Sequence, residues 1–236
     1  MKDKIILALD VDSMDEAGRW VEMLYDNVGL FKVGKQLFTS SGPDVVRMIK
    51  GKGGGVFLDL KFHDIPNTVA MASVEALRLG VDMFNVHALG GYQMMAVTAD
   101  AIAAEAERLS VRKPLFIAVT ILTSMNEEAV REVGISSNVR DEVIRLARLA
   151  KKAGLDGVVA SPHEIELIKE SCGDDFIVVT PGVRPSFASA DDQKRIMTPS
   201  EAVRAGADYL VIGRPITKAE RPEEAAKAIA EEMCQG

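Results

Sequence analysis

An Asp and a Lys stand two positions apart in a segment that is otherwise apolar. The run Gly55–Lys61 reads Gly-Val-Phe-Leu-Asp-Leu-Lys, so Asp59 and Lys61 are its charged residues. Residues two apart in a β-strand point to the same face, and Leu58 and Leu60 then occupy the other face. A buried Asp beside a buried Lys has coupled pKa values. Such a pair is either a structural ion pair or a proton donor held in its charged form by carboxylates. We favour the proton donor, Lys61.

Charged residues also lie at the ends of other short apolar runs. Asp10 and Lys32 lie near the ends of the first two runs. If these ends meet in space, the two residues extend the pair into an alternating Asp–Lys–Asp–Lys chain. A charged side chain at a buried strand end costs free energy unless it is paired or used. Any one of these residues alone is typical of a structural polar group, but the set together indicates a functional site.

Eight short apolar runs are predicted to be the strands that position these residues, and helix-length segments separate them. The predicted strands are Lys4–Asp10, Leu30–Gly34, Gly55–Lys61, Met83–His87, Leu115–Thr120, Gly157–Ser161, Phe176–Thr180 and Tyr209–Gly213. The predicted helices are Ser13–Asp26, Phe38–Lys50 with an interruption near Gly42-Pro43, Asn67–Leu79, Gly91–Leu109, Asn138–Ala153, His163–Cys172, Thr198–Ala205 and Pro222–Met233.

The alternation of strands and helices predicts one (β/α)8 TIM barrel domain over residues 1–236. Each unit takes about 30 residues, enough for a strand, a helix and two short loops. The active site of such a barrel lies at the C-terminal ends of the strands, where the charged residues are found. An open doubly wound sheet is the alternative, but its Gly-rich turn after the first strand is replaced here by Asp10-Val11-Asp12.

Helix ends are marked by glycine, and one phrase of sequence recurs. Gly80, Gly154 and Gly206 each follow a predicted helix, as a left-handed C-terminal residue does. The phrases Ala-Gly-Leu-Asp-Gly-Val-Val and Ala-Gly-Ala-Asp-Tyr-Leu-Val contain the last two of these glycines and lead into predicted strands. The similarity is a weak internal echo rather than a true repeat.

A phosphate site is predicted near the last two strands. In this fold the loops after strands seven and eight often bind phosphate. Gly213 allows a backbone N–H to approach an anion, and Arg214 adds a forked permanent charge. The long irregular segment Pro181–Met197 contains Arg184 and Gln193, which would close over an anionic ligand if the segment acts as a lid.

Composition excludes several classes of protein. The net charge of −7 and the absence of a basic tail argue against nucleic-acid binding. No stretch approaches the roughly 20 apolar residues that span a membrane, and the apolar run at the N-terminus is too short for a signal peptide. Cys172 and Cys234 do not form a CxxC motif, which argues against a disulfide scaffold or a Cys-rich zinc site. Cytoplasm is the expected compartment.

The histidines and paired methionines receive more ordinary interpretations. The three histidines do not have the spacing of metal ligands. We interpret His87 as a site-wall residue or a hydrogen-bonding core residue, and His163 as structural. Met94 and Met95 lie on a predicted helix and are interpreted as core filling.

The decapeptide Asp59-Leu60-Lys61-Phe62-His63-Asp64-Ile65-Pro66-Asn67-Thr68 resembles the signature of the bacterial orotidine 5′-phosphate decarboxylase family. Its Asp-x-Lys-x-x-Asp core is shared by a wider group of barrels, but the full run is more specific. Supporting segments occur in order along nearly the whole chain: Ala8–Asp10, Phe31–Gly34, Asn85–Ala88, Leu122–Ser124, Thr180–Arg184 and Val211–Thr217.

The resemblance implies a carboxy-lyase that converts orotidine 5′-phosphate to uridine 5′-phosphate (UMP) and CO2, the last step of de novo pyrimidine synthesis. It implies neither a metal nor an organic cofactor. It also implies a homodimer in which Asp64, Ile65 and Thr68 reach into the active site of the partner subunit. Lys61 and Asp59 would then act in catalysis together with Asp64 from the partner subunit.

The resemblance also assigns residues to parts of the substrate. Lys32 and Asp10 would hold the ribose hydroxyls, with Thr68 from the other subunit. The pyrimidine would face Thr123 and Ser124. The remaining substrate-binding residues would be Pro181 and the phosphate-binding set of Arg184, Gln193, Gly213 and Arg214.

Two alternative functions would require different residues at these positions. A magnesium-dependent sugar-phosphate decarboxylase or aldolase of the same superfamily would carry an acidic metal ligand at the strand-two position where this chain has Lys32. A non-catalytic binder of phosphorylated metabolites would be expected to have lost Lys61 or Asp59, and both are present.

Overall fold

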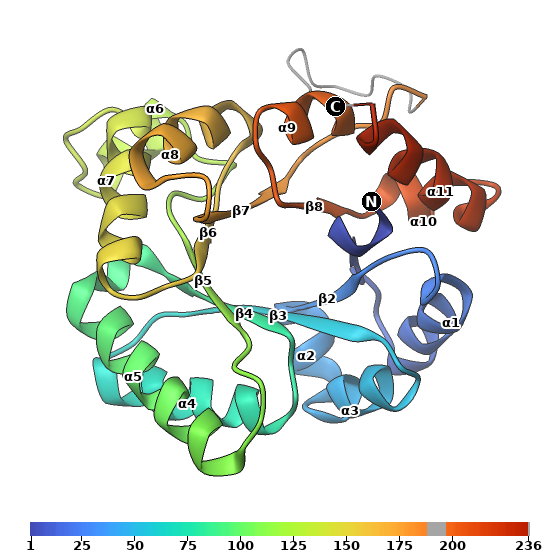
Figure 1. Cartoon of the computed structure of the whole chain (residues 1–236), viewed down its shortest axis with the longest axis horizontal. Coiled ribbons are helices and arrows are strands. Elements are labelled where there is room, and N and C mark those ends of the chain that lie inside the picture. The colour runs from blue at the N-terminus through green and yellow to red at the C-terminus, as the bar shows by residue number, and fades with distance from the viewer. Residues whose placement is uncertain (188–196, 236) are drawn as a thin grey trace.

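Eight parallel strands form a closed barrel in the computed structural model, which describes residues 1–187 and 197–235. The strands follow one another around the ring in chain order, and β1 pairs with β8 to close it (Figure 1). The predicted (β/α)8 barrel is therefore confirmed. The strands are β1 (Ile5–Ala8), β2 (Leu30–Gly34), β3 (Gly55–Phe62), β4 (Met83–His87), β5 (Leu115–Val119), β6 (Gly157–Val159), β7 (Ile177–Pro181) and β8 (Tyr209–Ile212).

Helices surround the ring of strands. The α-helices are α1 (Met14–Leu24), α2 (Lys35–Ser41), α3 (Asp44–Gly51), α4 (Pro66–Arg78), α5 (Gly91–Leu109), α6 (Glu127–Glu132), α7 (Val139–Lys152), α8 (Ile165–Cys172), α9 (Pro199–Arg204), α10 (Arg214–Thr217) and α11 (Pro222–Met233). Short 3-10 helices are η1 (Lys2–Lys4), η2 (Ala88–Gly90) and η3 (Pro162–Glu164). Among the helices that the structure describes, none is long and apolar enough to cross a membrane.

The helix predictions differ from the structure in three places. The predicted helix Phe38–Lys50 is two helices, α2 and α3, which meet at Gly42-Pro43 as expected. The predicted helix His163–Cys172 begins as the 3-10 turn η3 and becomes α-helical at Ile165. The short helices α6 and α10 were not predicted, because six and four residues are too few to show a helical period.

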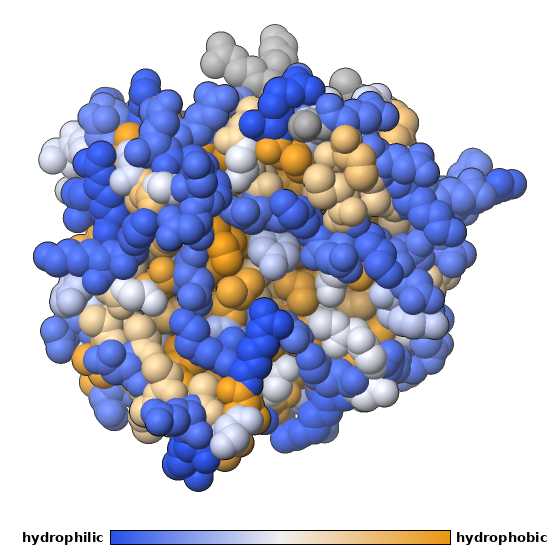
Figure 2. All heavy atoms as spheres, viewed as in Figure 1, coloured by the Kyte–Doolittle hydropathy of each residue, from blue (hydrophilic) through white to orange (hydrophobic). Residues whose placement is uncertain are grey.

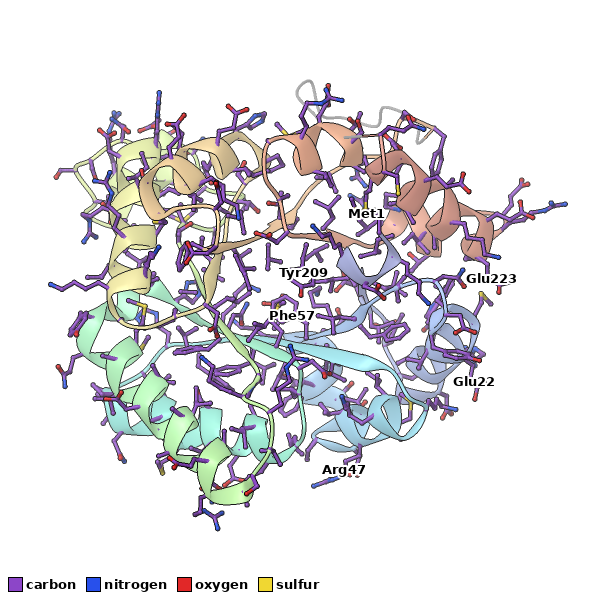
Figure 3. All side chains as sticks on the ribbon, viewed as in Figure 1. Met1, Glu22, Arg47, Phe57, Tyr209 and Glu223 are labelled. Carbon is purple, nitrogen blue, oxygen red and sulfur yellow. The ribbon has the colours of Figure 1, made fainter. Side chains whose placement is uncertain are left out.

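Apolar side chains alternate between two cores. Ile6, Phe57, Met83, Ile117 and Val179 pack against one another inside the barrel. The alternating residues, such as Leu58 and Phe84, face the helices and join the larger outer core, which includes Met94 and Met95 as predicted. Figure 3 shows the labelled Phe57 and Tyr209 near the centre of the ring. Asp59 lies two residues beyond Phe57 and therefore also points into the barrel.

Hydrophilic residues cover most of the rim of the face seen in Figure 2, and hydrophobic residues show between them in its middle. The helix η1 lies to one side of the ring in Figure 1, next to α11. The glycines predicted to end helices do so: Gly80, Gly154 and Gly206 have φ angles of +77°, +86° and +107°. Without a Cβ, glycine adopts this conformation at little cost.

The recurring phrase of sequence corresponds to a recurring contact at the N-terminal ends of the strands. Asp82, Asp156 and Asp208 each come directly before an even-numbered strand. Each carboxylate accepts the backbone N–H of the preceding odd-numbered strand, at Val56 (2.7 Å), Phe116 (2.8 Å) and Val178 (2.8 Å). A lysine also donates to each, namely Lys50, Lys113 and Lys169. The echo therefore marks an aspartate that ties two neighbouring strands together.

Candidate active site

A cavity of about 380 Å³ opens at the C-terminal ends of the strands. Phe57 and Val159 line it from within the barrel, below the ring of polar residues at the strand ends. The structure brings together most of the site residues predicted from the sequence. The predicted residues that line this cavity are Asp10, Lys32, Asp59, Lys61, Thr123, Pro181, Arg184, Gly213 and Arg214.

Four charged side chains form a continuous chain in the cavity. Lys32 Nζ lies 3.1 Å from Asp10 Oδ1 and 3.7 Å from Asp59 Oδ2. Lys61 Nζ donates to Asp59 Oδ1 at 2.5 Å. The side chains of Lys32 and Asp59 are 12% and 13% exposed, whereas that of Asp10 is 70% exposed. The two ammonium groups thus share one nearly buried carboxylate, and water screens the contact with Asp10 more than the others.

The backbone at Lys61 departs from the regular strand assumed in the sequence analysis. Lys61 has a φ of +52°, in the left-handed region. The pairing of β3 with β4 shifts between Leu58 and Phe62. The Asp59 and Lys61 side chains thus meet at an irregularity in the strand, where regular alternation of side chains does not hold. A left-handed conformation costs a residue with a Cβ about 1–2 kcal/mol, so the surrounding contacts must hold it.

Asn85 in β4 supplies such contacts, a role that the sequence pattern did not predict. Its Oδ1 accepts the N–H of Lys61 at 2.8 Å, and its Nδ2 donates to Asp59 Oδ1 at 2.7 Å. The residue is 1% exposed. The available signal was its spacing: Asn85 lies two residues beyond the inward-facing Met83, which places a polar side chain inside the barrel.

The predicted phosphate-binding residues lie on the opposite side of the cavity from β3. Gly213 follows β8, and Arg214 begins α10 with an exposed side chain. Arg184 follows β7 and is half-buried, and its N–H donates to the carbonyl oxygen of Met197 at 3.1 Å. This bond joins the two ends of the segment between β7 and α9. Gln193 lies outside the residues that the structure describes.

The remaining predicted residues do not line the cavity of this chain. Asp64, Ile65 and Thr68 are exposed around the start of α4, and Ile65 has 67% of its surface accessible. The Asp64 carboxylate accepts the N–H of Ile65 at 2.6 Å. Ser124 is also exposed, in the loop after β5, although its neighbour Thr123 reaches the cavity.

His87 lies beside the cavity and does not line it, which corrects the site-wall interpretation. Its ring centroid is 5.6 Å from that of His63, and the two rings are tilted by 42°. Burial is the main cause that lowers the pKa of His87 to about 4, and the electrostatic effects of the nearby His63, Lys35 and Lys61 lower it further. His87 is therefore neutral at physiological pH.

Within residues 1–187 and 197–235, no group of three His, Cys, Asp or Glu side chains is arranged to hold a metal ion.

A closed (β/α)8 barrel with a charged, partly buried cavity at the C-terminal ends of its strands has the architecture of the barrel enzymes, whose active sites lie at that end. Comparison with known proteins narrows this class. The model of the orotidine 5′-phosphate decarboxylase / HUMPS family matches residues 3–229. The chain therefore belongs to this family.

Named relatives and solved structures resemble the chain along its whole length. It is 62% identical to orotidine 5′-phosphate decarboxylase of Geotalea daltonii, over 99% of this chain and 97% of that protein. It is also 62% identical to the Geobacter sulfurreducens protein of the same name, over 100% of this chain and 98% of that protein. The crystal structure of orotidine 5′-phosphate decarboxylase from Lactobacillus acidophilus superimposes with a TM-score of 0.87 at 38% identity, covering 97% of this chain and 98% of that one.

Proposed function

We propose that this chain converts orotidine 5′-phosphate to UMP and CO2, which is the last step of de novo pyrimidine synthesis. The observation that carries the proposal is the Lys32–Asp59–Lys61 charge chain in the cavity, in a protein 62% identical to decarboxylases of that name. Substrate and product are nucleotides of the cell interior, so we also place the protein in the cytoplasm.

The proposed reaction requires strong electrostatic stabilisation. When the bond between C6 of the pyrimidine and the carboxylate breaks, the electron pair stays on C6 as a carbanion without an electron sink. The protein must therefore stabilise that charge directly, with fixed charges in a site that excludes water. The Lys61 ammonium, 23% exposed and hydrogen-bonded to Asp59, is the candidate both for stabilising the carbanion and for protonating it. It stabilises the negative charge and then donates its proton to C6, and the neutral amine regains a proton from water.

Asp59 is proposed to act on the departing carboxylate. Lys32 and Lys61 both contact its carboxylate, and a substrate carboxylate placed against that carboxylate is repelled in the ground state. The repulsion ends when neutral CO2 leaves. The same carboxylate holds the Lys61 ammonium at 2.5 Å and so fixes the position of the proton donor.

The phosphate of the substrate is proposed to bind at Arg184, Gly213 and Arg214, far from the bond that breaks. Thr123 and Pro181 line the space between, where the pyrimidine would lie. Binding energy from a remote group raises the rate if it serves to assemble the charged site around the substrate. Gln193 is assigned to the same phosphate on the resemblance, together with Ser124 for the pyrimidine.

A homodimer is part of the proposal. Asp64, Ile65 and Thr68 lie on an exposed surface, and the side chains of Ile65 and Leu89 expose 67% and 42% of their area beside Asp64. Apolar side chains exposed next to a carboxylate are suited to burial by a second copy of the chain. In the dimer, Asp64 would approach Lys61 of the other subunit, and Thr68 would complete the ribose site formed by Asp10 and Lys32.

Turnover of orotidine 5′-phosphate, followed by ultraviolet absorbance in the presence of excess chelator, tests the proposed function. We expect conversion to UMP at an unchanged rate when the chelator is added, because Lys32 already places an ammonium between two carboxylates. A divalent ion would be repelled there. If well-folded protein left the nucleotide unchanged, the proposal would be wrong, and a magnesium-dependent reaction of a sugar phosphate would be tested next.

A further inference from the structure

We propose that Asn85 is a positioning residue that holds the catalytic pair Asp59 and Lys61 in its working geometry. The inference rests on the proposed decarboxylation. Asn85 projects from β4 into the barrel with 1% of its surface exposed, and it does not line the cavity. It therefore acts on the substrate through its two neighbours, both of which do line the cavity.

The orientation of the Asn85 amide follows from its partners. The backbone N–H of Lys61 can only donate, so the group 2.8 Å away must be the amide oxygen. A carboxylate can only accept, so the group 2.7 Å from Asp59 Oδ1 must be the amide nitrogen. One planar side chain thus ties the main chain of Lys61 to the carboxylate of Asp59. No other uncharged residue type has an acceptor and a donor separated in this way on so short a stem.

The first bond supports an unfavourable backbone conformation. Lys61 is left-handed, and the β3–β4 pairing is shifted at this point. A backbone N–H that loses its strand partner must find another acceptor or pay a desolvation penalty. Asn85 Oδ1 is that acceptor. It therefore helps to keep Lys61 in the conformation from which its side chain reaches Asp59.

The second bond fixes the rotation of the Asp59 carboxylate. Oδ1 receives both Lys61 Nζ and Asn85 Nδ2, while Oδ2 faces Lys32 Nζ at 3.7 Å. An ammonium on a flexible stem does not restrain a carboxylate plane, whereas an amide on a strand does. The amide also donates without adding a charge. Asn85 therefore orients Asp59 and leaves the charge balance of the site unaltered.

Two substitutions separate these contributions. Asn85→Ala removes both bonds. Asn85→Asp keeps the size of the side chain and an acceptor for the Lys61 N–H, but it places a second carboxylate against Asp59. Asn27→Ala is the matched control, because Asn27 is also buried, at 8% exposure, and lies before β2 at the opposite end of the barrel.

The kinetic constants for orotidine 5′-phosphate and the affinity for UMP are measured for each variant, after circular dichroism has confirmed its fold. We expect kcat to fall about 100-fold in Asn85→Ala, the effect of misplacing reacting groups by about an ångström. KM and the calorimetric Kd of UMP should stay within about threefold, because the phosphate and ribose contacts remain. In Asn85→Asp, kcat should fall by at least as much as in Asn85→Ala. The Asn27→Ala variant should have the kinetic constants of the wild type.

Several outcomes would overturn the inference. A folded Asn85→Ala enzyme with a kcat within about threefold of wild type would show that positioning is not required. So would a rise in KM at unchanged kcat, or full activity in Asn85→Asp. If Asn85→Ala did not fold, the isosteric Asn85→Asp variant would decide. A wild-type protein without turnover would instead contradict the proposed function, which keeps the two failures distinct.

Discussion

Replacing Lys61 with glycine should give a more stable protein than replacing it with alanine, although both variants lack the ammonium group. The two variants lose the same ion pair with Asp59, and they differ only in a Cβ attached to a backbone with a φ of +52°. Their difference in stability therefore reports the backbone conformation alone. In most positions the order is the reverse, because glycine loses more conformational entropy on folding.

The magnitude follows from two opposing terms. The left-handed conformation costs alanine about 1–2 kcal/mol, and glycine nothing comparable. Glycine loses more conformational entropy than alanine on folding, and this destabilises the Lys61→Gly variant by about 0.5–1 kcal/mol. With both terms near the middle of their ranges, the net advantage of Lys61→Gly is about 0.5–1 kcal/mol. In a domain of this size a change of 1 kcal/mol moves Tm by roughly 2–4 °C, so we expect a difference of about 1–4 °C.

Thermal unfolding of both variants, followed by circular dichroism at one pH and one protein concentration, measures this difference. Equal concentration matters because association stabilises the folded state by mass action. Ser110 provides a positive control: it is exposed, has a φ of +53° and ends α5, so Ser110→Gly should exceed Ser110→Ala in Tm. Ala103 provides a control in which glycine destabilises the protein, because this residue is exposed within α5. In Ala103→Gly the free energy of unfolding should fall by about 1 kcal/mol.

The fall in Tm measured for Ala103→Gly shows how large a glycine effect to expect where the backbone is not left-handed. If Lys61→Gly melted below Lys61→Ala by a similar amount, the backbone at Lys61 would not be left-handed in solution. The role assigned to Asn85 Oδ1 would then lose its physical reason as well. If the two variants melted together, the restraint from Asn85 and its neighbours would be weaker than the structure implies.

Three further predictions concern the site. Arg214→Ala should raise KM for the nucleotide at least 10-fold while leaving turnover of the phosphate-free nucleoside unchanged, since a charge-assisted bond contributes about 1.5–3 kcal/mol; equal effects on both substrates would remove Arg214 from the phosphate site. Mixed Asp64→Ala and Lys61→Ala chains, each inactive alone, should regain activity through one intact composite site, and no recovery after demonstrated subunit exchange would contradict the shared site. His87 has a folded pKa of about 4 against an ordinary value of 6.5, so its stabilising effect is present at neutral pH and is lost as the pH falls from about 6.5 towards 4. Urea unfolding measures the free energy of unfolding at about pH 7 and about pH 5. Between these two pH values that free energy should fall less in His87→Asn than in the wild type, and an equal fall in both would contradict the low pKa of His87.

The barrel and much of the charged site could be predicted because their signals are local. Apolar runs separated by helical periods specify the strands, and charged residues at strand ends specify the cavity. The charge chain of Asp10, Lys32, Asp59 and Lys61 needed only these two signals. Predicted strand ends were one or two residues too late at β1, β5, β6 and β8, because the sequence pattern continues past the last residue of the strand.

Other features depend on contacts that a sequence pattern does not contain. The left-handed backbone at Lys61 lacks the glycine that usually announces it, because side chains from a neighbouring strand hold it in place. Asn85 is a single polar residue in an apolar run, and such a residue is equally typical of an ordinary structural hydrogen bond. The exposed placement of Asp64, Ile65 and Thr68 has a functional explanation only in the proposed homodimer, which the sequence pattern of one chain does not contain.

The three aspartates before the even-numbered strands have a consequence for the order in which the barrel folds. Each binds a backbone N–H only 26, 40 or 30 residues away, so the pairs β3–β4, β5–β6 and β7–β8 each carry their own register signal. The pair β1–β2 has Gly29 in the corresponding place, where a Cβ would lie 2.2 Å from the carbonyl oxygen of Asp3. Loops of such length close early, whereas pairing the two ends of the chain is entropically slow. We therefore expect three strand pairs to form first and the ring to close last at β1, so that the catalytic cavity is assembled only in the final step of folding.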